Sequence, residues 1–119
     1  MKYLVMIYDA EDKGPTPGTP EFDSYMGRWV AVDKAFKEAG VLVGGEALEP
    51  STAATRVMVR GGKTQTLDGP FAETKEQLGG YYILDCESLD EAIKYAAMIP
   101  VEETGTLEVR PIMDLSNMG

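Results

Sequence analysis

The sequence contains no histidine and only one cysteine among its 119 residues. Without an imidazole the chain cannot use a histidine general base, a cysteine–histidine pair or a histidine metal ligand. The single thiol, Cys86, permits no disulfide within the chain, which is typical of a protein kept in a reducing compartment. We therefore expect a cytoplasmic protein and exclude the chemistries that depend on histidine.

Long apolar runs and positive charge are also scarce. No stretch approaches the roughly 18 apolar residues that a membrane-spanning helix needs. The apolar residues 3–8 are followed at once by acidic residues, which does not match a signal peptide. The 11 basic and 20 acidic side chains give a net charge of −9. Because nucleic acids and anionic membranes repel such a chain, neither is an expected partner.

Periodicity predicts two helices in a chain long enough for one domain, residues 1–119. The first begins at Pro20, with Thr19 as its cap, and ends at Gly40. Its apolar stripe comprises Phe22, Tyr25, Trp29, Val32, Phe36 and Ala39. The second follows a capping box at residues 88–91, ends at Pro100, and carries the stripe Leu89, Ala92, Ile93, Ala96 and Ala97. Residues 10–19, with two prolines and two glycines, predict a long loop that is either a lid over a site or a plain connector.

Six segments read as strands. They are residues 2–8, 41–48, 55–60, 63–67, 81–86 and 106–113. Gly61 and Gly62 predict a tight hairpin between the third and fourth, and Gly44 and Gly45 indicate a bulge or a close backbone contact. With that hairpin set aside, the order β-α-β-β-α-β predicts an α+β fold of the ferredoxin-like, split βαβ type with an inserted β-hairpin. Strands 2–8 and 81–86 are apolar on both faces, as the two central strands should be.

This fold leaves one face of the sheet without a covering layer. Two helices cover only one face of a four-stranded sheet, yet the central strands carry Tyr, Val, Ile, Leu and Met on both faces. We therefore expect a homodimer in which two sheets pack face to face. The alternative is that the tyrosine side chains make the second face tolerant of water.

Residues 67–82 read LDGPFAETKEQLGGYY, and this segment resembles the DGPF proteins, a branch of the YCII-related family. The resemblance continues through residues 39–48, 88–92 and 109–113, so it covers nearly the whole chain in order. It implies a dimeric α+β barrel of ferredoxin-like subunits. The family is largely uncharacterised, and members occur beside or fused to extracytoplasmic-function sigma factors, which implies a functional link to such a factor.

One feature of the family is missing. YCII-related proteins usually carry a histidine on the first helix, paired with an aspartate. Counting back from Gly40, the matching position lies near Trp29, within about one turn. Because the chain has no histidine, chemistry of this kind cannot be carried over to it.

Two carboxylates are the candidate catalytic groups, Asp68 and Glu76. Asp68 begins the Asp-Gly-Pro-Phe turn that leads toward a central strand, and sites often lie at loop ends. Its alternative role is structural, because an aspartate at this place accepts backbone N–H groups within a turn. If the two carboxylates lie close together, their pKa values separate and they share a proton.

The candidate ligand-binding residues are Tyr25, Trp29, Glu46, Gly69, Phe71 and Lys75. Tyr25 and Trp29 either line a cavity between helix and sheet or belong to the core. Glu46 either faces that cavity or marks a strand end. Lys75 either contacts an anion or lies in a solvated polar loop with surface ion pairs.

Two functions from different classes fit these residues. The first is a small-molecule-binding module with an accessory or regulatory role. The second is a cofactor-free enzyme that uses carboxylate acid–base chemistry on a small polar or aromatic substrate. A purely structural dimer without a site is a third interpretation. No cysteine pair or metal-ligand spacing is present, so no cofactor and no metal is expected.

Overall fold

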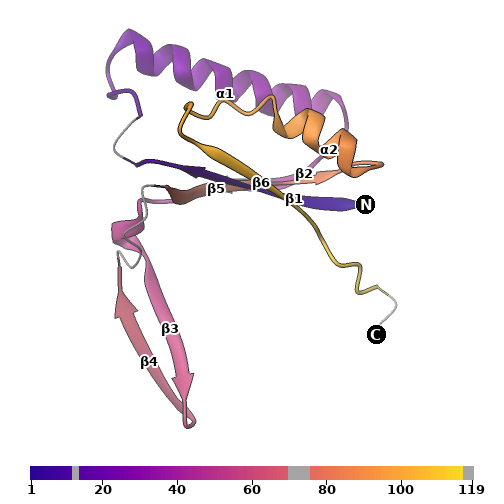
Figure 1. Cartoon of the computed structure of the whole chain (residues 1–119). Helices are drawn as coiled ribbons and strands as arrows, with labels where there is room; N and C mark the ends of the chain where they lie inside the picture. Colours follow the sequence, from indigo (N-terminus) through magenta and orange to yellow (C-terminus); the bar gives the residue numbers. More distant parts are fainter. Residues whose placement is uncertain (12–13, 70–75, 117–119) are drawn as a thin grey trace.

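The structure, a computed structural model, describes residues 1–11, 14–69 and 76–116. Four strands form an antiparallel sheet in the order β2-β5-β1-β6, and two helices cover one of its faces (Figure 1). The elements are β1 (Lys2–Asp9), α1 (Pro20–Glu38), β2 (Leu42–Ala47), the 3₁₀ turn η1 (Ser51–Ala53), β3 (Thr55–Arg60), β4 (Lys63–Asp68), β5 (Gln77–Asp85), α2 (Leu89–Ala96) and β6 (Thr106–Pro111). This α+β arrangement is compatible with the ferredoxin-like fold, and β1 and β5 occupy the centre of the sheet as predicted.

Both helices begin at the predicted caps. The Thr19 hydroxyl accepts the backbone N–H of Phe22 at 3.2 Å, and the Ser88 hydroxyl accepts that of Glu91 at 3.2 Å. Gly40, with φ +71°, follows the last turn of α1 in the left-handed conformation that glycine tolerates best. Among the described residues, no helix has the length and apolar character needed to cross a membrane.

The core lies between the helices and the sheet. Phe36, Val5 and Leu84 are its largest fully buried side chains. The Phe36 ring meets the rings of Tyr82 and Tyr95 edge-on, with centroids 5.2 and 5.9 Å away. Phe36 and Val32 are the buried residues of α1, and both belong to its C-terminal half. The N-terminal half of this helix therefore contributes little to the closed core.

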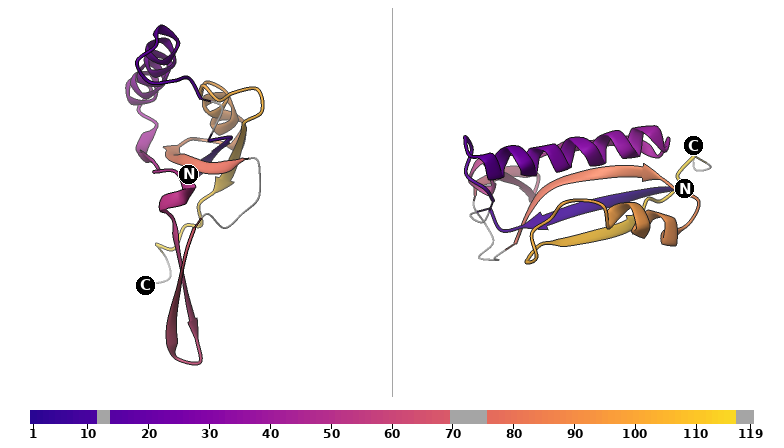
Figure 2. Two further views of the ribbon diagram at one scale, coloured as in Figure 1. Left: turned by 90° about the vertical axis from the view of Figure 1, so that its left-hand side faces the viewer. Right: turned by 90° about the horizontal axis from the view of Figure 1, so that it is seen from above.

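The second helix differs from its predicted apolar stripe. Ala92 and Ala96 are buried, whereas Leu89 and Ile93 are 46% and 49% exposed. The helix packs on β1 and β6: Ala92 and Ala96 belong to the core and Tyr95 packs against it, whereas Leu89 and Ile93 do not. Seen from above, α2 covers the β6 side of the sheet and α1 covers the β2 side (Figure 2).

Strand register decides which side chains lie on the uncovered face. Val5 is fully buried beneath the helices, and the alternating residues Leu4, Met6 and Tyr8 lie on the opposite face, half-buried. Met6 is paired with Tyr81 on one side and with Glu108 on the other. This face therefore carries a half-buried apolar centre although no helix covers it.

The glycine pair in β2 shows both features that the sequence indicated. The register shifts between Leu42 and Gly44, which is a bulge. At Gly45 an added Cβ would stand 2.7 Å from the backbone oxygen of Tyr81, so β2 and β5 approach each other closely.

The predicted hairpin is present but forms a sheet of its own. Strands β3 and β4 pair from Thr55–Asp68 to Arg60–Lys63, and Gly61 and Gly62 turn the chain with φ values of +57° and +76°. Two positive φ values are what a two-residue hairpin turn requires. The hairpin projects from the side of the main sheet opposite to the helices (Figures 1 and 2).

The loop before α1 is tied to the base of this hairpin. The carboxylate of Glu11 accepts the backbone N–H of Ser51 at 2.7 Å and its hydroxyl at 2.9 Å. This contact ties one residue of the predicted long loop to η1, and its role as a lid or a connector stays a prediction; residues 12 and 13 lie outside the described ranges.

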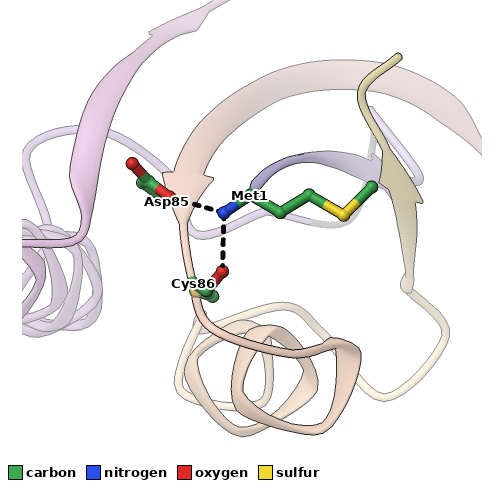
Figure 3. A network of polar contacts seen from close by, with 3 residues as sticks. All are labelled: Met1, Asp85 and Cys86. Atoms are coloured by element: carbon green, nitrogen blue, oxygen red, sulfur yellow. Dashed lines mark hydrogen bonds and ion pairs between the residues drawn. The ribbon is translucent and has the colours of Figure 1, made fainter. Parts of the chain in front are cut away.

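At the other end of the sheet, the chain terminus meets the end of β5. The Met1 amino group donates to Asp85 Oδ1 at 3.0 Å and to the backbone oxygen of Cys86 at 3.1 Å (Figure 3). Cys86 itself is 2% exposed, as expected for a structural thiol. Burial raises the pKa of this thiol, and the negative charges of Glu91 and Asp85 raise it further. The thiol is therefore a poor nucleophile.

Candidate functional site: a cleft beneath the first helix

A cleft of about 430 Å³ lies between the N-terminal half of α1 and the sheet. The hairpin leaves the sheet at the same end (Figure 1). Its volume is within the range of small-molecule sites, roughly 300–1,000 Å³. Side chains of α1 form its wall, and β1, β2 and β5 supply its floor.

Four of the nine residues that the strands contribute to the floor of the cleft have little or no side chain. Gly45, Ala47, Gly79 and Gly80 all contribute to it. In the sheet, Ala47 is paired with Gly80, and Gly80 with Ile7. Because Ala47 and Gly80 have no large side chains, these two positions leave space beneath α1. The sequence shows these residues as two glycine pairs, but their meeting depends on a pairing between distant strands.

The wall of the cleft is aromatic. Tyr25 and Trp29 lie on it, with ring centroids 6.1 Å apart in an edge-to-face arrangement, and Met26 lies between them in the sequence. Both rings are half-buried, and the guanidinium of Arg28 stands 5.5 Å from the centre of the Tyr25 ring. Trp29 also packs against the core, so it combines both roles that the sequence allowed.

The polar groups of the cleft come from Asp9 and the tyrosines. Asp9 Oδ1 accepts the backbone N–H of Ala10 at 2.9 Å, and Oδ2 accepts that of Glu102 at 3.2 Å. This carboxylate therefore holds two chain segments together at the edge of the cleft. Burial, and secondly the negative charge of Asp33, raise the pKa of Tyr82 above the ordinary value of a tyrosine.

The two candidate catalytic carboxylates lie elsewhere. Asp68 is the last residue of β4, is exposed, and accepts the hydroxyl of Thr55 at 3.1 Å across the hairpin. Glu76 accepts the hydroxyl of Thr106, the first residue of β6, at 3.0 Å. Neither carboxylate is among the described residues that line the cleft. Their hydrogen-bond partners belong to two different sheets.

The other candidate binding residues are distributed in three ways. Glu46 stands next to the end of β2, and its backbone oxygen borders the floor, but register pairs its side chain with Tyr81 on the uncovered face. Gly69 donates its N–H to the backbone oxygen of Ala54 at 2.7 Å and so extends the hairpin base. Phe71 and Lys75 lie outside the described residues.

The sequence did not single out Asp9, Met26 or Tyr82 as part of a site. Their signals are weak, because an acidic strand end, a helical methionine and a strand tyrosine all occur without any function. In the described part of the chain, no three His, Cys, Asp or Glu residues gather in a group suited to a metal ion.

Comparison with known proteins places the chain in a family. The model of the YCII-related domain matches residues 1–116. An uncharacterised protein of Rhizobium meliloti (strain 1021) is 41% identical over 114 residues, which is 94% of this chain and 92% of the relative. The name of that relative gives no function, so the match supports membership of a family and says nothing about an activity. The chain belongs to the YCII-related family.

Proposed function

We propose that the protein is a single-domain small-molecule-binding module of the DGPF type, with an accessory or regulatory role, and that its ligand occupies the cleft beneath α1. The cleft itself carries the proposal. It combines an aromatic wall with a floor that includes three glycines and an alanine, and its volume of about 430 Å³ suits a metabolite-sized molecule.

The lining indicates the class of ligand. The rings of Tyr25 and Trp29 offer apolar contact area, and the glycines and the alanine of the floor leave room for a flat ring. Tyr82 is among the lining residues, and in this proposal its hydroxyl is the hydrogen-bond donor to the ligand. The net charge of −9 and the Asp9 carboxylate disfavour anions. A neutral or cationic aromatic molecule therefore fits the cleft best.

Ligand binding is better supported than carboxylate catalysis. An acid–base enzyme needs its groups within reach of a bound substrate. Asp68 and Glu76 instead hydrogen-bond to threonines outside the cleft, each with its own partner. If the protein were a purely structural dimer, the aromatic wall and the open floor of the cleft would have no role.

Fluorescence of the sole tryptophan, Trp29, reports on the cleft directly. Titration with a panel of neutral and cationic aromatic metabolites should quench or shift this signal, and native mass spectrometry of gently purified protein should show a retained molecule. We expect Tyr25→Ala to raise the Kd at least about tenfold, which corresponds to about 1.4 kcal/mol of lost contact. The control is Val30→Ala, because Val30 is 66% exposed on the same helix and lies outside the lining. Equal loss in both variants, or no response to any ligand, would contradict the proposal.

The functional unit in this proposal is a homodimer, the dimeric α+β barrel of the family. Its support is the uncovered sheet face, where Leu4, Met6, Tyr8, Tyr81 and Ile83 present a half-buried apolar surface. A second sheet packed on this face would remove that surface from water. Analytical ultracentrifugation should find a dimer at micromolar concentration, which Met6→Arg dissociates and Val30→Arg leaves intact. A monomeric wild-type protein would contradict this part of the proposal.

The family resemblance and the composition support two further parts of the proposal. The regulatory partner is an extracytoplasmic-function sigma factor, and the location is the cytoplasm. Co-purification of a chromosomally tagged protein tests the first, and cell fractionation tests the second.

A further inference from the structure

The hairpin of β3 and β4 lacks packing of its own. Within residues 1–11, 14–69 and 76–116 its strands pair only with each other, and every residue of the two strands except Met58 is exposed. Val57, Val59 and Leu67 are 64%, 63% and 53% exposed. A two-stranded hairpin is marginally stable in water and needs a further layer against its apolar face. Some surface must therefore supply this layer.

The direction of the hairpin indicates where that surface lies. It leaves the main sheet on the side that no helix covers, as two perpendicular views show (Figures 1 and 2). Six residues in each strand give a length of about 20 Å at about 3.3 Å per residue. Packed sheets lie only about 10 Å apart. The hairpin is therefore long enough to pass a second sheet stacked on the uncovered face and to lie along its flank.

The charge of the hairpin identifies the kind of surface. Residues 55–68 contain Arg56, Arg60 and Lys63 against Asp68, which gives +2 and leaves −11 on the remainder of a chain whose net charge is −9. The hairpin is thus a cationic projection from a strongly acidic body. A second copy of the same body has the complementary charge and is present at equal concentration.

Register places two valines on one face of the hairpin and its three cations on the other, where Met58 and Leu67 also lie. Val57 faces the same side as Thr66, and Val59 the same side as Thr64, so one face is uncharged over most of its length. Arg60 and Lys63 form the pair beside the turn and belong to the opposite face. The hairpin can therefore bury its valine face against a partner, while the long side chains of Arg60 and Lys63 reach round the tip toward acidic groups at the margin of the contact.

We propose that β3 and β4 form an interchain arm that packs against the acidic body of a second copy of this chain. This inference rests on the homodimer proposed above and specifies a second contact within it, separate from the sheet-to-sheet contact. The arm contributes apolar area through Val57 and Val59, and electrostatic attraction through Arg60 and Lys63.

Charge reversal at the tip tests the arm. We expect Arg60→Glu/Lys63→Glu to raise the dimer Kd at least tenfold at 50 mM salt, measured by sedimentation at several concentrations. The matched control, Lys34→Glu/Lys94→Glu, makes the same change in net charge on the two helices that cover the opposite face. The difference between the two variants should shrink at 1 M salt, where the Debye length is only about 3 Å. Equal dimer Kd values for the two variants at low salt would contradict the proposed contact between the hairpin and the second copy.

Val57→Thr/Val59→Thr is the second variant. Threonine keeps the branched shape and the strand propensity of valine, so the hairpin itself should persist, which circular dichroism checks. The added hydroxyls should weaken the dimer at least fivefold if the valines are buried at the interface. An unchanged Kd would overturn the arm. If Met6→Arg dissociates the dimer but both hairpin variants dimerise like their control, the proposed homodimer is supported and the proposed arm is contradicted. A monomeric wild-type protein would contradict both proposals.

Discussion

Replacing Gly80 by alanine, with Gly79→Ala as its control, tests the close approach of β2 and β5 beneath the cleft. An added Cβ at Gly80 would stand 2.9 Å from the backbone oxygen of Glu46 and 3.4 Å from the Cα of Ala47. At Gly79 the nearest atom is the backbone oxygen of Ile7 at 3.8 Å, which is ordinary van der Waals contact. Neither glycine has a positive φ, so alanine meets no conformational barrier at either position.

The two substitutions should therefore change stability in different directions. At Gly80 the methyl group presses on backbone, which cannot rotate away, and overpacking of this kind costs about 1–3 kcal/mol. At Gly79 the same methyl group fits, and the reduced freedom of the unfolded chain stabilises the protein by up to about 1 kcal/mol. The entropy of unfolding for a chain of this length is about 0.25 kcal/mol/K, so 2 kcal/mol corresponds to about 8 °C in Tm.

The measurement is thermal and urea unfolding followed by circular dichroism, at one fixed protein concentration because a dimer makes Tm concentration-dependent. Gly80→Ala should melt several degrees below the wild type, and Gly79→Ala at or above it. The methyl group at Gly80 also enters the cleft floor, so the Trp29 signal should respond more weakly to ligand. Equal Tm values for the two variants would refute the close contact between β2 and β5.

Three further outcomes follow from single side chains. Phe36→Ala should lower the free energy of unfolding by about 3–5 kcal/mol in urea, because the ring is fully buried and its removal leaves a cavity; a loss below 1 kcal/mol would contradict its central place in the core. Because burial raises the pKa of Cys86 in the folded state, its unfolded-state thiol, with a pKa of about 8.5, ionises first. The free energy of unfolding should therefore fall as pH rises from about 8 through the folded-state pKa, and Cys86→Ala should flatten this slope. An equally steep slope in the variant would show that the Cys86 thiol does not cause the pH dependence. Asp68→Asn should cost less than about 1 kcal/mol and leave ligand binding unchanged, because its hydrogen bond to Thr55 is exposed; weaker ligand binding would place Asp68 in the site.

The parts of the fold that depend on local chemistry were predictable. Thr19 and Ser88 lie where side-chain oxygens cap the helices, and Gly61 and Gly62 take the positive φ values of a two-residue turn. The central positions of β1 and β5 followed from apolar residues on both faces, because only a central strand of this sheet needs them. The homodimer predicted from the same pattern stays a prediction.

The site was only partly predictable, because it depends on contacts between distant segments. The aromatic stripe of α1 was readable, but the open floor depends on Ala47 meeting Gly80. Regular alternation from Leu42 would place Glu46 on the helix side of the sheet. The bulge before Gly44 shifts the register by one residue and turns the Glu46 side chain to the other face. The Asp-Gly-Pro-Phe motif indicated a turn, but composition does not fix the direction in which a hairpin projects.

The route of the chain between β2 and β5 has a consequence for how this protein varies and can be altered. These two strands are antiparallel neighbours, and Leu48 donates its N–H to the backbone oxygen of Gly79 at 2.9 Å. The excursion through β3 and β4 thus leaves and rejoins the main sheet at a single point. In topological terms it is one long loop of a β2–β5 hairpin, and a short turn in its place would close the same sheet. Insertions, deletions and grafted peptides should therefore be tolerated here without rebuilding the helices, so the segment can diversify independently of the scaffold that carries it.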